Sequence, residues 1–76
     1  MSRPRKMTPN ELQEEYGINP AQAKYNYDIG RKYVAIEYDG DGGDTAYAFR
    51  SSLYDAEEWF WENKKFFGNI VQLAKC

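Results

Sequence analysis

The fold is decided by a stretch in the middle of the chain, YVAIEYDGDGGDTAYAFR, which covers residues 33–50. Its two ends alternate between faces with a period of two, which is typical of β-strands. The segment between them, residues 39–44, contains three glycines and three aspartates. Glycine supplies the positive φ angles that a tight reversal needs. The stretch therefore predicts an antiparallel hairpin, with strands over residues 33–38 and 45–50.

One face of this hairpin is more hydrophobic than the other. Because successive side chains of a strand point to opposite faces, Val34, Ile36 and Tyr38 share a face. In the returning strand, Tyr47 and Phe49 join them. The opposite face collects alanines and charged residues. We expect the first face to be the core side of the sheet.

Two helical signals precede the hairpin. Residues 8–11, Thr-Pro-Asn-Glu, have the spacing of a capping box with proline at the first helical position. Gly17 is a natural stop for this helix. Residues 19–22, Asn-Pro-Ala-Gln, repeat the pattern, and the second helix is expected to end near Gly30. Both helices are short, so they need tertiary packing to persist.

A longer helix and a last strand follow the hairpin. Ser51 and Ser52 precede a helical pattern over residues 53–67, and Gly68 ends it. Residues 70–73 then read as a strand. The helix has an apolar stripe at 3.6-residue spacing, formed by Ala56, Trp59, Phe60, Asn63, Phe66 and Phe67.

These elements predict an α+β fold: two short N-terminal helices followed by a β-β-α-β unit. The last strand should lie antiparallel beside the first, giving a three-stranded antiparallel sheet of order 2-1-3 that one long helix covers. Residues 8–76 form a single small domain in this interpretation. Residues 1–7, which contain Arg3, Arg5 and Lys6, are expected to be a flexible basic arm.

Composition sets further bounds. A chain of 76 residues with 17% aromatic residues must build a dense core, because small domains bury a modest fraction of their surface. Its single cysteine, Cys76, cannot form an internal disulfide, which fits a reducing, cytoplasmic compartment. No apolar segment follows the basic N-terminus, so neither a signal peptide nor a membrane span is expected.

Catalytic chemistry has few candidates in this sequence. There is no histidine, so an ordinary general base near neutral pH is missing, and Cys76 lies where chains fray. The acids of residues 39–44 suggest calcium, but an EF-hand needs glycine at position six and glutamate at position twelve, where Asp44 and Arg50 stand. We expect no enzyme activity, no cofactor and no metal site.

The charge distribution indicates the kind of partner. All 12 acids lie between residues 11 and 62, where four basic residues leave a net charge of −8. A field of this sign repels nucleic-acid phosphates and attracts basic protein surfaces. The alternative is that the acids only keep the surface soluble.

The long helix supplies the best candidate surface. If Trp59 and Phe60 face inward, Trp61 points outward among carboxylates, as in an interface hot spot. Alternatively, Trp61 packs under the two N-terminal helices. The candidate contacts with a basic protein surface are Asp39, Asp41, Asp44, Tyr54, Glu57, Glu58, Trp61 and Glu62.

A second hypothesis is a small DNA-binding regulator. Residues 12–30 resemble a helix-turn-helix, and the hairpin over residues 33–50 could serve as its wing. The acids Glu11, Glu14, Glu15 and Asp28 have the wrong charge for this role, so direct nucleic-acid binding is less favoured. Its candidate contacts are Gln22, Lys24, Tyr25, Asn26, Arg31 and Lys32.

The segment from Phe49 to Phe60, Phe-Arg-Ser-Ser-Leu-Tyr-Asp-Ala-Glu-Glu-Trp-Phe, places a polar cap before an acidic, aromatic helix. With the preceding hairpin, residues 34–60 resemble the strand-hairpin-strand-helix units of small phage inhibitor proteins, including some anti-CRISPR proteins. The resemblance implies a short intracellular inhibitor that occupies a basic, nucleic-acid-binding surface of a larger host protein or nucleoprotein complex.

Overall fold

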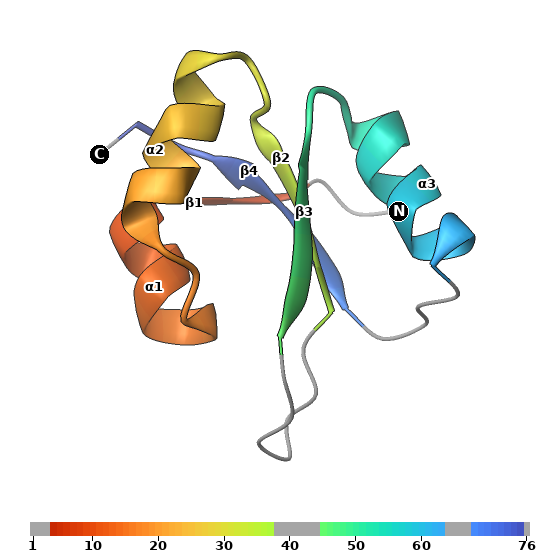
Figure 1. The fold of residues 1–76 in the computed structure, drawn as a ribbon, viewed down its shortest axis with the longest axis horizontal. Helices are drawn as coiled ribbons and strands as arrows, with labels where there is room; N and C mark the ends of the chain where they lie inside the picture. Colours follow the sequence, from red (N-terminus) through yellow and green to blue (C-terminus); the bar gives the residue numbers. More distant parts are fainter. Residues whose placement is uncertain (1–3, 38–44, 64–67, 76) are drawn as a thin grey trace.

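The computed structural model describes residues 4–37, 45–63 and 68–75 (Figure 1). These residues form three helices and four strands. In order, they are β1 (Arg5–Met7), α1 (Pro9–Tyr16), α2 (Pro20–Asp28), β2 (Tyr33–Glu37), β3 (Ala46–Arg50), α3 (Leu53–Glu62) and β4 (Asn69–Leu73). None of these helices has the length and apolar composition that crossing a bilayer requires, within the described residues.

The strands form one mixed sheet of order β1-β4-β2-β3. β2 is antiparallel to β3 on one side and to β4 on the other, so the predicted hairpin and the predicted neighbour of its first strand are confirmed. β1 adds a fourth strand, parallel to β4. The prediction of three antiparallel strands was therefore wrong in strand count and in direction at that edge.

β1 also corrects the prediction of a flexible arm over residues 1–7. Arg5 and Lys6 are exposed, but Met7 is completely buried, and its carbonyl oxygen accepts a hydrogen bond of 2.8 Å from the Ala74 N–H. A single apolar residue anchors the strand, and one residue produces no periodic signal. Residues 1–3 lie outside the described part of the chain.

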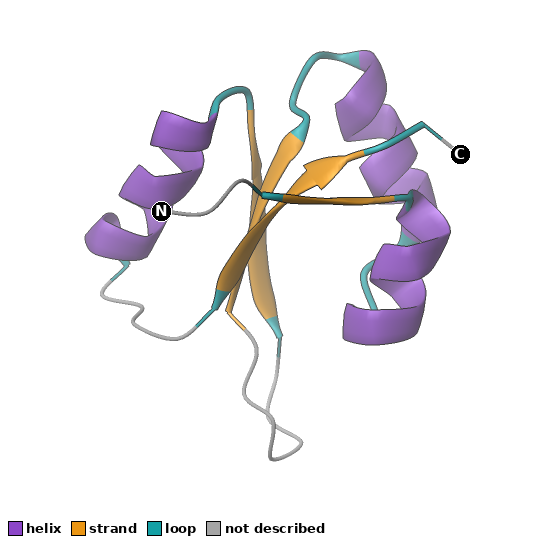
Figure 2. Ribbon diagram, turned by 180° about the vertical axis from the view of Figure 1, so that it is seen from behind, coloured by secondary structure: helices purple, strands orange, loops and turns teal. Residues whose placement is uncertain are grey.

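Helices lie on both faces of the sheet (Figures 1 and 2). α1 and α2 cover the face that carries Val34, Ile36 and Phe49, and Leu12 and Ile18 join these residues in the main core. The face predicted to be the core side is therefore confirmed. It is covered by the two short helices, while α3 lies on the opposite face against β2 and β3.

Small residues let α3 approach its face of the sheet closely. Ala35 of β2 and Ala56 of α3 are both completely buried. Gly68 lies close to this layer, because a Cβ atom there would collide with the Ile36 carbonyl oxygen and come within 2.7 Å of the Phe60 ring. The helix ends at Glu62, earlier than the predicted range of 53–67; residues 64–67 lie outside the described part.

The predicted capping box of α1 and the predicted cap Asn19 of α2 are confirmed, whereas the Gln22 side chain accepts from Tyr47. Thr8 Oγ1 accepts from the Glu11 N–H at 3.2 Å, and the Glu11 carboxylate accepts from the Thr8 N–H at 3.0 Å, which lowers the pKa of Glu11. Gly17 ends α1 in the left-handed region with φ of 73°. Asn19 Oδ1 accepts from the Ala21 N–H at 2.8 Å and begins α2. The caps satisfy backbone groups that a helix terminus leaves unpaired.

Candidate functional site

The most exposed large hydrophobic side chains of the described residues lie on α3. Trp61 is 78% exposed and Tyr54 is 73% exposed. They are seven residues apart, which puts them on the same face of a helix two turns apart. α3 lies on the far side of the sheet from α1 and α2 (Figure 2). The outward orientation of Trp61 is thus confirmed, and packing of Trp61 under the N-terminal helices is ruled out.

Two features determine which residues of α3 face the sheet and which face solvent: its N-terminal cap and its two inner aromatic rings. The Ser52 hydroxyl accepts from the Asp55 N–H at 3.1 Å and caps the helix. Trp59 and Phe60 are half-buried and meet edge to face, with ring centroids 5.2 Å apart. Once these two rings face the sheet, the next residue, Trp61, must point to solvent.

Two carboxylates share the exposed face with the two rings. Glu58 and Glu62 are exposed and lie four and eight residues after Tyr54. We call Tyr54, Glu58, Trp61 and Glu62 the α3 outer face. The predicted contact Glu57 is half-buried and lies beside this face. The four residues of the outer face are the exposed residues of α3, and all four are among the predicted contacts; their role as contacts stays a prediction.

Within the described residues of α3, the outer face carries acidic side chains and no basic one. A side-chain hydrogen bond with Glu62 raises the pKa of Glu58, and repulsion from Glu62 and Asp55 adds to the shift. A hydrogen bond between two carboxyl groups requires a proton on one of them, so Glu58 holds a proton more readily than an isolated glutamate does. The last turn of α3 has no basic residue. Carboxylates near a helix C-terminus are unfavourable, because the helix dipole is negative there.

Replacing Glu58 with glutamine is expected to stabilise the protein at pH 7 and to have little effect near pH 4. The folded pKa of Glu58 is raised, so the folded state binds the proton more tightly than the unfolded state. The stability that this tighter proton binding contributes is fully present below the unfolded pKa of Glu58. It is lost as pH rises through the folded pKa. Urea unfolding of both proteins between about pH 4 and pH 8 measures the difference.

The matched control is Glu14→Gln, which removes an exposed carboxylate from α1. Its stability difference from the wild type should vary less with pH than that of Glu58→Gln. A Glu58→Gln difference that is flat between these pH values would contradict the proton sharing of Glu58 and Glu62.

The other acidic candidates are not on described residues. Asp39, Asp41 and Asp44 belong to the hairpin tip, which lies outside the described ranges, so their role stays a prediction. In residues 4–37, 45–63 and 68–75, no three acidic or cysteine side chains gather closely enough to hold a metal ion.

The DNA-binding candidates on α2 are only partly available to a ligand. Asn26 is 7% exposed and its Nδ2 donates to the Gln22 carbonyl oxygen at 2.8 Å, so the prediction that it faces a groove was wrong. The Gln22 side chain accepts from the Tyr47 hydroxyl at 2.8 Å. Sequence reasoning missed this burial, because an asparagine in a polar helix gives no apolar signal.

The remaining DNA-binding candidates are exposed. Tyr25 is 64% exposed, and Lys24 and Arg31 are also exposed. Lys32 is also exposed, but its ammonium lies 4.7 Å from the centroid of the Tyr27 ring. The strands of the predicted wing are integral to the sheet, since β2 lies between β3 and β4.

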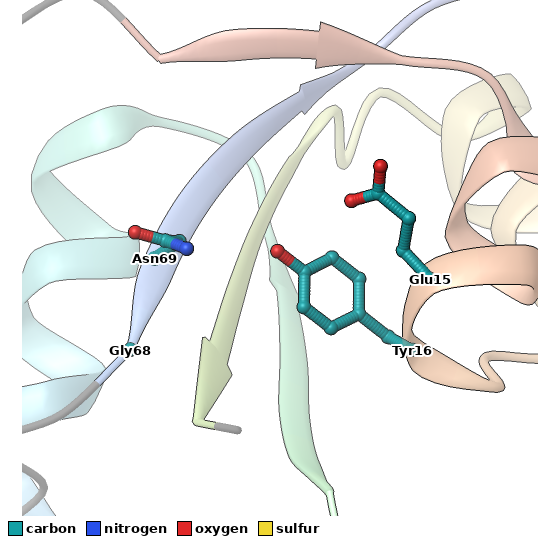
Figure 3. Close-up of a pocket in the computed structure, with 4 residues that line it drawn as sticks. All are labelled: Glu15, Tyr16, Gly68 and Asn69. Atoms are coloured by element: carbon teal, nitrogen blue, oxygen red, sulfur yellow. The ribbon is translucent and has the colours of Figure 1, made fainter. Parts of the chain in front are cut away.

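A hollow of about 460 Å³ opens between α1 and the beginning of β4 (Figure 3). Glu15, Tyr16, Gly68 and Asn69 line it. Glu15 is already paired with the Arg5 guanidinium at 3.3 Å. Sequence reasoning did not identify this hollow, because its two walls come from distant segments that share no motif.

Comparison with known proteins adds no relative. The chain matches no protein-family model, no curated protein and no solved structure.

Proposed function

We propose that the protein is a non-catalytic interaction protein whose α3 outer face binds a basic surface of a larger protein or nucleoprotein complex. The observation that carries this proposal is the exposure of Trp61 and Tyr54 on one helical face with Glu58 and Glu62. Exposed aromatic residues with neighbouring charges are typical of interface hot spots. Tryptophan and tyrosine provide large contact areas at a low cost in conformational entropy.

The charges of the outer face favour a cationic partner. An arginine or lysine placed near Glu58 and Glu62 would replace their repulsion by two attractive interactions, and the hydrogen bonds would be charge-assisted. The same cation could lie over the ring of Trp61, which adds a cation–π contribution. Binding of this kind favours the deprotonated form of Glu58, whose pKa the hydrogen bond with Glu62 raises in the free protein.

Occupying a basic surface would prevent that surface from binding nucleic acid. Basic surfaces of nucleic-acid-binding proteins are shaped to neutralise phosphates. An acidic helix that covers such a surface competes with nucleic acid, so we propose inhibition as the outcome. A DNA-binding role has weaker support, because Asn26 is buried and Gln22 is hydrogen-bonded within the protein.

Reversing the charge of the outer face is expected to abolish partner binding. The double variant Glu58→Lys with Glu62→Lys should weaken the complex by at least about 30-fold, which corresponds to a hot-spot loss of about 2 kcal/mol. To find the partner, an extract of the native cells is passed over the immobilised wild-type protein. Mass spectrometry then identifies the nucleic-acid-binding proteins that are retained. Titration of each variant with the purified partner supplies the affinity.

The matched control reverses two exposed acids elsewhere, Glu14→Lys with Asp28→Lys on α1 and α2. It produces the same change in net charge away from the α3 outer face. Equal losses in the two double variants would indicate attraction to net charge alone. If the variant with Glu58 and Glu62 reversed keeps full affinity, the α3 outer face is not the binding surface.

A further inference from the structure

The two edges of the sheet differ in how they are protected. Exposed strand edges offer unpaired backbone groups to other chains, and proteins usually shield them with short strands, charges or proline. β1 has all three protections: it has three residues, exposes Arg5 and Lys6, and follows Pro4. β3 has five residues, Ala-Tyr-Ala-Phe-Arg, with no proline, no glycine and no charge before its last residue.

The sheet register fixes which backbone groups of β3 point to the free edge. The Leu73 N–H donates to the Lys32 carbonyl oxygen at 2.7 Å. Hydrogen-bonded pairs alternate along antiparallel strands, so Val34 also bonds to β4. The backbone groups of the neighbouring β2 residues, such as Ala35, point the other way and therefore bond to β3.

Ala48 is the partner of Ala35, so its backbone groups point toward β2. Those of Tyr47 and Phe49 consequently point away from the sheet. One hydrogen bond supports this assignment directly: Arg50 Nη1 donates to the Phe49 carbonyl oxygen at 2.9 Å. The Arg50 side chain thus occupies an acceptor that the free edge exposes. Among the described residues, no strand pairs with this side of β3.

We propose that the free edge of β3 pairs with β3 of a second copy of this chain, antiparallel and centred on Ala48. Ala48 is the middle residue of the strand, so this register overlaps the whole of β3 in both copies. Tyr47 of each copy then lies opposite Phe49 of the other, and their outward groups form four hydrogen bonds. The two Ala48 methyl groups meet in the closer, non-hydrogen-bonded pair, where small side chains fit.

The same register is complementary in charge. It places Arg50 opposite Ala46 of the second copy, whose other neighbour across the sheet is Glu37. These three side chains lie on one face, and the long guanidinium can extend over the small alanine toward the carboxylate. Twofold symmetry produces this contact twice. In the paired state, the Phe49 carbonyl oxygen accepts from a backbone N–H of the second copy in place of the Arg50 side chain. The Arg50 guanidinium is then free to reach the carboxylate. A second copy therefore fits this edge in both backbone and charge.

The pairing edge is separate from the α3 outer face, so either proposal can fail while the other stands. An interface of one strand is small, which places the dimer among weak, concentration-dependent associations. Sedimentation equilibrium from about 10 µM to about 1 mM should show the mass double from 8.9 kDa. Amide exchange of the wild-type protein, followed by NMR, locates the interface.

The amides of Tyr47 and Phe49 are expected to exchange about tenfold more slowly at the high concentration. Those of Ala46 and Ala48, already directed at β2, should change much less. A protein that stays monomeric at about 1 mM would overturn the proposal. So would a dimer in which exchange at Tyr47 and Phe49 is independent of concentration, or one in which only α3 amides respond.

A pair of variants at one position isolates the backbone donor. Tyr47→Pro removes an N–H that points to the free edge, where proline is tolerated in a sheet. Tyr47→Ala loses the same ring but keeps the N–H. We expect Tyr47→Ala to dimerise and Tyr47→Pro to remain monomeric; equal dimerisation of both folded variants would exclude the strand pairing. If Tyr47→Pro does not fold, the wild-type exchange measurement decides the matter.

Discussion

Replacing Met7 with alanine is expected to lower the free energy of unfolding by about 2–5 kcal/mol, the usual range for truncating a fully buried methionine. Met7 is completely buried in the main core and lies opposite Leu73 across the parallel pair of β1 and β4. The alanine variant leaves a cavity that the packed core does not refill. Thermal and urea unfolding measure the loss, and the midpoint temperature should fall by roughly 4–8 °C for each kcal/mol.

Lys6→Ala is the matched control, because Lys6 is the exposed neighbour on the same strand. Its effect should stay within about 0.5 kcal/mol, as for most surface substitutions. Similar stabilities of the Met7 and Lys6 variants would mean that β1 does not contribute to the core. The two variants therefore distinguish a docked strand from a flexible arm.

Replacing Gly68 with alanine is expected to destabilise the protein by about 1–3 kcal/mol, the usual cost of overpacking, although Gly68 itself is exposed. The new Cβ would collide with the Ile36 carbonyl oxygen and lie 2.7 Å from the Phe60 ring. A ring can move, but a backbone carbonyl in a paired strand cannot rotate away without breaking the sheet. Chemical unfolding followed by tryptophan fluorescence measures the change.

Gly17→Ala separates steric collision from backbone strain. Gly17 has φ of 73° and no atom within 4 Å of its hypothetical Cβ, so an alanine there meets strain alone. A single non-glycine residue in the left-handed region costs about 1 kcal/mol. We expect Gly68→Ala to be the more damaging of the two. The reverse order would show that the β4 approach has room for a side chain.

The elements that sequence reasoning predicted well are those with local signals. The capping box of Thr8 and Glu11 involves residues three apart, and the geometry of one helical turn is enough to specify it. The hairpin of β2 and β3 is specified by alternation and a glycine-rich reversal. The exposure of Trp61 followed from helical phase, since Trp59 and Phe60 occupy the opposite side.

The errors concern contacts between distant segments. β1 is a strand because β4 lies beside it, and no pattern within residues 1–7 indicates that partner. The division of helices between the two sheet faces depends on which layer each apolar stripe meets. Asn26 is buried because of its place in α2, although its residue type favours the surface. Tertiary context outweighs local propensity at each of these points.

The pairing of β1 with β4 has a consequence for the order in which the protein acquires its shape during synthesis. The ribosome releases β1 before β4, because three helices and two strands separate the two paired strands in the chain. Until β4 is synthesised, Met7 and the apolar residues that later surround it stay exposed to solvent in the nascent chain. Chaperones that recognise short apolar segments should therefore bind the segment around β1, and synthesis of β4 should release them.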